Sequence, residues 1–241
     1  KNRTICTLKM SQIINLFPLS IYKSKIDCSK NSKDQMIKEI FDMEKKSKNP
    51  EFKKKNLSWT GDTQGYEYLN KNPKFKELFS KIKVEIINYV KNFDIDFEQL
   101  DFYIQRAWAT ISRGPESIQN HIHGQSHITF AYYLKKEEGD SKISFYDNHK
   151  HNEFITGLFG SKTGGRNVVK KMNPLNASVV NIDAKEGDLV IFPSKTFHGT
   201  SQNSSINNKD RISIAADISI FAKDSTNLEQ FITPINEWEK F

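Results

Sequence analysis

The apolar pattern of the chain changes period near residue 100, and this change limits the folds that the chain can adopt. From Phe75 to Val90 apolar residues recur at helical spacing, and Asn72-Pro73 before them is typical of a helix start. From Phe102 onward the chain consists of short β-rich runs separated by Gly, Asn, Asp and Lys residues. Such runs predict an antiparallel sandwich or barrel.

Two helices and six strands are expected, so the fold class is mainly β. One helix covers Ser32 to Met43 with Asp34 as its N-cap, and the second runs from Pro73 to Asn92. The expected strands cover residues 102–111, 128–134, 143–146, 179–183, 188–192 and 211–221. We therefore divide the chain into three parts: a helical flank packed on the core (1–100), a β core (101–221) and a C-terminal tail (222–241).

Composition excludes several classes of partner. The 241 residues contain no apolar run near the length of a transmembrane helix, so no membrane partner is expected. The net charge of +7 comes almost entirely from Lys, and Arg-aromatic clusters that read bases are missing, so nucleic acid is not an expected partner. Cys6 and Cys28 are too few for a disulfide framework, which favours a cytoplasmic location.

Met10 is a candidate native start, as is Lys1.

Three of the six histidines fall within seven residues, at 121, 123 and 127. Residues two apart on a strand point to the same face, so His121 and His123 can converge on one ion. His198 follows an apolar strand that ends at Pro193 and is the best-placed third ligand. Imidazole suits iron, copper, nickel and zinc, and three ligands leave positions open, as a catalytic metal requires.

The remaining histidines are given other roles. His127 lies past Gly124 and is expected to line the pocket rather than bind metal. His149 and His151 form a second pair at this spacing, but they lack an apolar strand context and are not expected as ligands. They belong to a long insertion between Asp147 and Ser178, a length typical of a lid or binding loop.

Arg211 is a candidate anchor for an oxoacid. A site that activates O2 at Fe(II) needs electrons, which an oxoacid such as 2-oxoglutarate supplies by decarboxylating. Arg211 lies on an apolar segment, and its planar guanidinium pairs with carboxylate through two bonds. Ser213 points to the same face, and Tyr133 could join them from a facing strand. Alternatively, Arg211 pairs with an internal carboxylate such as Asp188 or Asp217.

These residues resemble the Fe(II)- and 2-oxoglutarate-dependent oxygenases, in particular a prolyl-hydroxylase-like subgroup frequent in marine bacteria and phages. The similarity runs from about Trp108 to Ile218, and more weakly through Asn15–Leu19 and Trp59-Thr60-Gly61. The matching positions are His121-Ile122-His123, Ser126, Tyr132-Tyr133-Leu134, Gly187 to Ser194, His198 and Arg211-Ile212-Ser213. The resemblance implies a double-stranded β-helix (jelly roll) core, Fe(II), 2-oxoglutarate and O2, and a hydroxylation that yields succinate and CO2. A phage-encoded chain would act in the host cytoplasm.

The chain departs from the superfamily pattern at His123, where a carboxylate, as H-x-D or H-x-E, is usual. Three imidazoles leave an Fe(II) site one negative charge short of two histidines and a carboxylate. Three arrangements follow: a three-histidine site, a carboxylate from elsewhere such as Asp147 or Asp140, or a water or halide as in the superfamily's halogenases. We favour the three-histidine site because the imidazole is already in place.

The first hypothesis is therefore an oxygenase, a hydroxylase of a small-molecule or peptidyl substrate. His121, His123 and His198 would hold the metal, and Arg211, Ser213 and Tyr133 would hold 2-oxoglutarate. The substrate would enter over the insertion, with Arg106, Trp108 and His127 as wall residues. One alternative is a cupin-like three-histidine dioxygenase that needs no oxoacid. The other is a non-catalytic jelly-roll binding module with a structural Zn²⁺.

Overall fold

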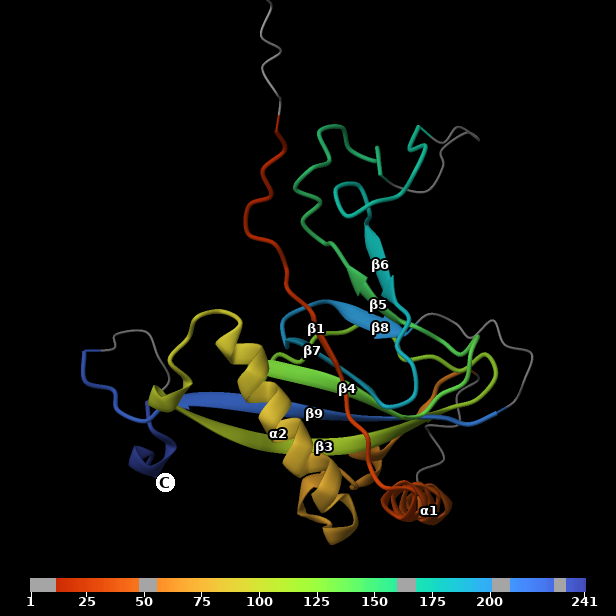
Figure 1. Ribbon diagram of the computed structural model, residues 1–241, viewed down its shortest axis with the longest axis vertical. Coiled ribbons are helices and arrows are strands. Elements are labelled where there is room, and N and C mark those ends of the chain that lie inside the picture. The colour runs from red at the N-terminus through yellow and green to blue at the C-terminus, as the bar shows by residue number, and fades with distance from the viewer. Residues whose placement is uncertain (1–11, 48–55, 160–167, 201–208, 228–232) are drawn as a thin grey trace, which may run out of the picture.

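The computed structural model describes residues 12–47, 56–159, 168–200, 209–227 and 233–241, and two antiparallel sheets form its body (Figure 1). The larger sheet has the strand order β1-β7-β4-β9-β3-β2, and the smaller has the order β6-β5-β8. The strands are β1 (Tyr22–Lys25), β2 (Trp59–Thr60), β3 (Leu100–Ser112), β4 (Ile128–Lys135), β5 (Ile143–Tyr146), β6 (Val179–Ile182), β7 (Asp188–Pro193), β8 (His198–Thr200) and β9 (Arg211–Ala222). All the expected strands are present, and the fold is the jelly roll that the resemblance implies.

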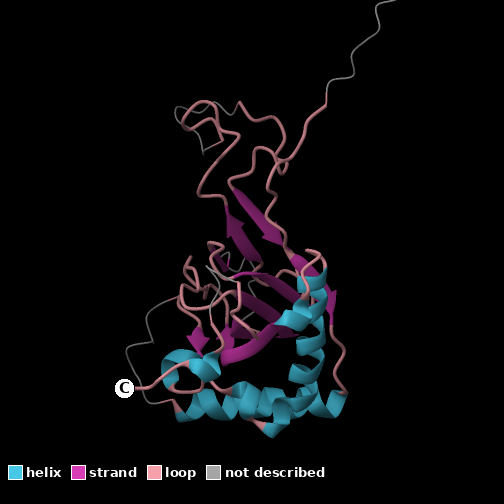
Figure 2. Ribbon diagram, turned by 90° about the vertical axis from the view of Figure 1, so that its left-hand side faces the viewer, coloured by secondary structure: helices cyan, strands magenta, loops and turns pink. Residues whose placement is uncertain are grey.

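Two helices cover one face of the larger sheet: α1 (Lys30–Lys46) and α2 (Lys76–Lys91) (Figure 2). The N-cap expected at Asp34 is wrong: α1 begins one turn earlier, where the Ser29 side chain accepts a hydrogen bond from the Ser32 amide. Asn72 caps the second helical segment as expected, but its first turn, Pro73–Phe75, is a 3₁₀ turn before α2.

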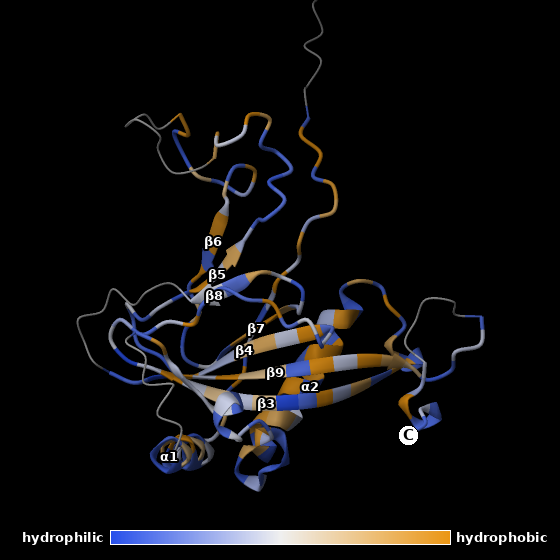
Figure 3. Ribbon diagram, turned by 180° about the vertical axis from the view of Figure 1, so that it is seen from behind, coloured by the Kyte–Doolittle hydropathy of each residue, from blue (hydrophilic) through white to orange (hydrophobic). Residues whose placement is uncertain are grey.

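Alternation along the strands divides the larger sheet into a helix-facing side and a site-facing side. On β9, Ile212, Ile214, Ala216 and Ile218 pack with the helices in the main core. The intervening β9 residues therefore face the smaller sheet. Figure 3 shows apolar lengths of β4, β9 and α2 side by side. A second core cluster, which includes Tyr133, Phe145 and Phe192, lies between the two sheets.

The first hundred residues supply strands as well as helices. β1 pairs with β7 and β2 pairs with β3, so both edges of the larger sheet come from this part of the chain. The described parts of the insertion, 147–159 and 168–178, contain no helix or strand and extend beyond β5 and β6 (Figure 1). Among the described residues, no helix is long and apolar enough to cross a membrane.

Candidate metal and cosubstrate site

A cavity of about 390 Å³ opens between the two sheets, and the expected site residues line it. Alternation on β3 turns Arg106, Trp108 and Thr110 toward this cavity, whereas Ala107, Ala109 and Ile111 pack in the core. The lining includes all six predicted metal and cosubstrate residues: His121, His123, Tyr133, His198, Arg211 and Ser213. The structure thus brings together in one cavity residues that are far apart in the sequence.

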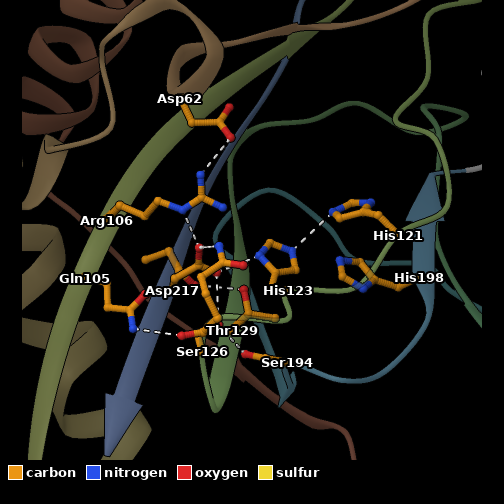
Figure 4. A network of polar contacts seen from close by, with 12 residues as sticks. Asp62, Gln105, Arg106, His121, His123, Ser126, Thr129, Ser194, His198 and Asp217 are labelled. Atoms are coloured by element: carbon orange, nitrogen blue, oxygen red, sulfur yellow. Dashed lines mark hydrogen bonds and ion pairs between the residues drawn. The ribbon is translucent and has the colours of Figure 1, made fainter.

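The three predicted ligands form a cluster in which one nitrogen of each ring lies within 4.8 Å of the others. His121 and His198 are joined by an isolated antiparallel bridge, and the His123 amide donates to the Ser194 carbonyl at 2.9 Å. Figure 4 shows the three rings turned toward one another. His123 and His198 are almost fully buried, at 5% and 6% exposure, so protein rather than solvent holds the rings in place.

Hydrogen bonds at the Nδ1 atoms fix the tautomers of the rings. Nδ1 of His121 lies 2.7 Å from the Gln119 carbonyl, and Nδ1 of His198 lies 2.8 Å from the Thr196 carbonyl. Because a carbonyl oxygen only accepts, each Nδ1 carries the proton and each Nε2 is left with a free lone pair. His123 has the same arrangement, with its Nδ1 2.6 Å from Oδ1 of Asp217.

The Nε2 atoms of His121 and His123 lie 3.2 Å apart. Two lone pairs that face each other at this distance repel unless a cation lies between them. With metal–nitrogen bonds of about 2.1 Å, neighbouring ligands of an octahedral ion lie about 3 Å apart. Burial lowers the pKa of His198 to about 3 and also lowers the pKa of His121, so both rings are neutral near pH 7. The cluster therefore fits a transition-metal ion.

Asp217 lies beside the cluster with a fully buried side chain and four donors around it. Oδ1 faces His123 and accepts from the Ser126 hydroxyl at 3.2 Å, and Oδ2 accepts from Arg106 Nε at 2.5 Å and from Gln125 at 3.0 Å (Figure 4). Burial opposes ionisation of this carboxyl, but His123 and Arg106 outweigh it and hold its pKa below the ordinary value. Asp217 is therefore a buried carboxylate.

Arg211, the predicted oxoacid anchor, is a buried cation that forms no ion pair with any described residue. It is 2% exposed, and its Nε and Nη1 atoms find no hydrogen-bond partner among the described residues. Its guanidinium lies 5.1 Å from the centre of the Tyr133 ring, and the Tyr133 hydroxyl is likewise unpartnered in the described part of the chain. Burial raises the pKa of Tyr133, so the hydroxyl stays protonated and can donate. These donors fit a carboxylate.

Several expectations about the surroundings of the site are wrong. His127 is exposed, and its Nδ1 accepts from the Ile220 amide instead of lining the cavity. Arg211 pairs with neither Asp188 nor Asp217, because Asp188 is bound to Lys23 and Asp217 to His123 and Arg106. Of the other expected wall residues, Arg106 and Trp108 do line the cavity, together with residues of 57–62 and 117–123, and no described residue of the insertion does.

The carboxylates suggested in place of His123 lie in turns. Asp140 accepts from the Glu137 amide, and Asp147 accepts from the amides of His149 and Lys150. His149 and His151 stack on each other at 5.3 Å and stay outside the metal cluster, as expected.

Sequence reasoning missed the roles of Asp62, Asn120 and Asp217 in this region. Asp62 and Asn120 line the cavity, and Asp62 lies 3.4 Å from Arg106. Asp62 follows the Trp59-Thr60-Gly61 sequence that carried the weaker part of the resemblance, so that motif was a usable signal. Asp217 is an even number of residues from Arg211 and Ser213 on the same strand, so its side chain points to the same face as theirs. This spacing was a second usable signal.

Comparisons with known proteins agree with this geometry. Residues 106–217 match the family described as "Putative 2OG-Fe(II) oxygenase". HygX from Streptomyces hygroscopicus, solved with nickel, 2-oxoglutarate and hygromycin B, is similar in structure at 10% identity, with 83% of each chain covered and a TM-score of 0.50. A prolyl-4-hydroxylase from Pseudomonas putida is similar at 9% identity, with 83% of this chain and 92% of that chain covered and a TM-score of 0.50.

A third solved structure is SnoN, a non-heme alpha-ketoglutarate-dependent epimerase from nogalamycin biosynthesis, at 8% identity, with 87% of this chain and 83% of that chain covered and a TM-score of 0.53. At these identities the structural similarities show the fold alone, and no curated protein gives a significant match. The family match adds the cofactors, Fe(II) and 2-oxoglutarate. Residues 106–217, somewhat less than half of the chain, thus match a family model of 2-oxoglutarate- and Fe(II)-dependent oxygenases.

Proposed function

We propose that His121, His123 and His198 hold Fe(II), and that Arg211 and Tyr133 hold the far carboxylate of 2-oxoglutarate in an enzyme that hydroxylates its substrate. The single observation that carries this proposal is the pairing, in one cavity, of a three-imidazole cluster with a buried arginine that has no anion partner among the described residues. A buried charge without a partner is costly, so it indicates a ligand that completes the site.

When bound, the metal and 2-oxoglutarate would supply the oxidising chemistry, in which one atom of O2 goes to the substrate, the other goes to succinate, and CO2 is released. The chain's own residues position these groups. The imidazoles present free Nε2 lone pairs because their Nδ1 protons are engaged. Arg211 and Tyr133, on β9 and β4, fix the oxoacid from the cavity floor, and the core behind them excludes water.

Arg211 distinguishes this function from a three-histidine dioxygenase that needs no oxoacid. In such an enzyme nothing would compensate a buried guanidinium whose Nε and Nη1 lack partners among the described residues. In the proposed enzyme the oxoacid carboxylate compensates it. A structural zinc module would also leave this arginine unexplained. The geometry therefore favours an oxoacid-dependent reaction.

We further propose a small-molecule or peptidyl substrate with polar groups near the reacting carbon. The cavity wall that does not belong to the oxoacid end carries Thr60, Asp62, Gln119 and Asn120 beside Trp108. These side chains offer several hydrogen-bond donors and acceptors against one aromatic face. They would orient a substrate over the histidine cluster.

Uncoupled turnover tests this function without a known substrate. Purified protein with Fe(II), ascorbate and labelled 2-oxoglutarate should release CO2 and succinate, and pyruvate should not replace 2-oxoglutarate. His198→Ala should abolish the release, because it removes a ligand. If oxygen were consumed equally with and without the oxoacid, or if His198→Ala released as much succinate as the unaltered protein, the proposal would fail.

A further inference from the structure

His123 stands where the superfamily pattern has a carboxylate ligand, so the metal would lack one negative charge. We propose that Asp217 replaces this charge from behind the ligand, and that it is the residue that makes His123 a metal ligand. Asp217 is thus a positioning residue: it touches neither the metal nor the substrate and acts through the His123 ring. This inference rests on the proposed function of the histidine cluster.

The geometry joins the two side chains directly. His123 Nδ1 lies 2.6 Å from Asp217 Oδ1, and both side chains are buried. A carboxylate only accepts, so this contact places the proton on Nδ1 and leaves Nε2 free toward His121 and His198. The other two rings use backbone carbonyls for the same purpose. His123 alone of these three ligands is therefore backed by a full negative charge.

Asp217 is itself held rigidly. It lies on β9, which pairs with β3 on one side and β4 on the other, opposite Arg106 and Thr129. Ser126, whose hydroxyl reaches Oδ1, also lies 2.7 Å from the Ser194 hydroxyl, and the Ser194 carbonyl holds the His123 amide. The carboxylate and the imidazole backbone are thus fixed to the same frame.

The charged side chains beside the histidine cluster, Arg106, Asp62 and Asp217, carry a net charge of −1. Arg106 bridges two carboxylates: its Nε contacts Asp217 at 2.5 Å, and its Nη1 contacts Asp62 at 3.4 Å. One cation between two anions gives a net charge of −1 beside the cluster. This equals the charge that a carboxylate ligand would have brought. The Trp108 ring stacks on the His123 ring with centroids 5.7 Å apart, and the Arg106 guanidinium lies 4.7 Å from the centre of the Trp108 ring.

A plain structural ion pair would have a different form. An Asp that served only to neutralise Arg106 would turn one or both oxygens to the guanidinium and none to His123. Here Oδ2 accepts from Arg106 and Gln125, while Oδ1 serves His123 and Ser126. Carboxylates that bind a metal-ligating imidazole raise its basicity, and their removal typically weakens metal binding about 10- to 100-fold. We expect an effect of this size for Asp217.

The test is a titration of the metal-free protein with Co(II) under nitrogen, followed by visible absorption. Asp217→Asn should bind Co(II) about 10- to 100-fold more weakly. If the new NH2 group faces Arg106 and Gln125, it meets two donors; if it faces His123, it favours the tautomer with the proton on Nε2, which cannot bind the metal. Asp140→Asn is the matched control: Asp140 is also buried, but it holds only a turn outside the cavity. Its affinity should stay within about twofold of the unaltered protein.

A double-mutant cycle separates the positioning role from a general effect on folding. His123→Asp restores the usual carboxylate ligand, so Asp217→Asn should not weaken Co(II) binding further in that background. An equal loss in both backgrounds, or no loss in the first, would overturn the inference. The proposed function is judged separately by His198→Ala: if that variant loses Co(II) but Asp217→Asn does not, only the role of Asp217 is wrong.

Discussion

His121 and His198 pair directly across two backbone hydrogen bonds. The His121 amide donates to the His198 carbonyl at 2.8 Å, and the His198 amide donates to the His121 carbonyl at 3.0 Å. The rings extend from this bridge with centroids 4.5 Å apart. Two ligands from distant parts of the sequence are thus set by backbone pairing, and the separation of their rings depends on how closely the two segments approach.

Gly199 permits this approach, and its substitution should disturb the cluster. A Cβ at Gly199 would collide with the Asn120 side chain and lie 3.0 Å from the Ile118 carbonyl. We expect Gly199→Ala to lower the free energy of unfolding by about 1–3 kcal/mol. It should also weaken Co(II) binding about tenfold or more, because the His121 segment must shift. Urea unfolding and Co(II) titration measure both effects.

Gly124→Ala is the matched control, since a Cβ at Gly124 would meet no atom within 4 Å. It lies in the same connecting segment and should leave stability and Co(II) affinity near those of the unaltered protein. Equal behaviour of the two alanine variants would show that the bridge tolerates a side chain, and the account of Gly199 would then be wrong.

Arg211→Met should have opposite effects on the free protein and on the oxoacid complex. Without a ligand the buried guanidinium lacks partners at two nitrogens, as far as the described residues show, so an apolar side chain of similar length should not lower the melting temperature. The same change should weaken 2-oxoglutarate binding at least about 100-fold, because the paired charge is lost. Calorimetry with and without 2-oxoglutarate measures both.

Arg113→Met gives the contrasting case. Arg113 is held by Glu44 and Asp210 and lies outside the cavity lining. This variant should be less stable than the unaltered protein but should bind 2-oxoglutarate normally. If Arg211→Met bound 2-oxoglutarate as tightly as Arg113→Met does, Arg211 would not be the anchor.

Glu77 on α2 should make a small contribution to stability that depends on pH. Its carboxylate accepts from Lys81 and from the Ser29 amide and hydroxyl, and these contacts lower its pKa from 4.5 to about 2. A depressed carboxyl pKa stabilises the fold above the unfolded value and loses that effect as the pH falls from 4.5 toward 2. Glu77→Gln should therefore cost no more than about 1 kcal/mol at pH 7 and nothing near pH 2.

Urea unfolding across this pH range measures the difference between Glu77→Gln and the unaltered protein. Glu138→Gln, on an exposed turn, serves as the comparison and should change little at any pH. A difference for Glu77→Gln that stayed constant from pH 7 to pH 2 would mean that packing, not charge, carries the effect.

Residue patterns could predict the strands and most of the site, because both follow from short-range rules. The alternation of Arg106, Trp108 and Thr110 on one face is visible in the sequence, and so are the spacing of His121 and His123 and that of Arg211 and Ser213. These rules place a residue on a face. They do not say which segments lie next to one another.

The features that sequence reasoning missed depend on such neighbours. Asp217 meets His123 only because β9 lies between β3 and β4, and Asp62 enters the cavity only because β2 pairs with β3. His127 was misplaced because its segment turns its ring to the β9 backbone at Ile220. The cap at Ser29 is different: its bond to the Ser32 amide is local, so the sequence did offer it as a cap candidate.

The most direct test of the central claim is a crystal soaked without oxygen in Fe(II) and 2-oxoglutarate, with anomalous data collected at the iron edge. We predict one strong iron peak bonded to Nε2 of His121, His123 and His198. The far carboxylate of 2-oxoglutarate should lie on Arg211 and Tyr133. An iron peak that excludes His123, or an oxoacid bound away from Arg211, would contradict this account.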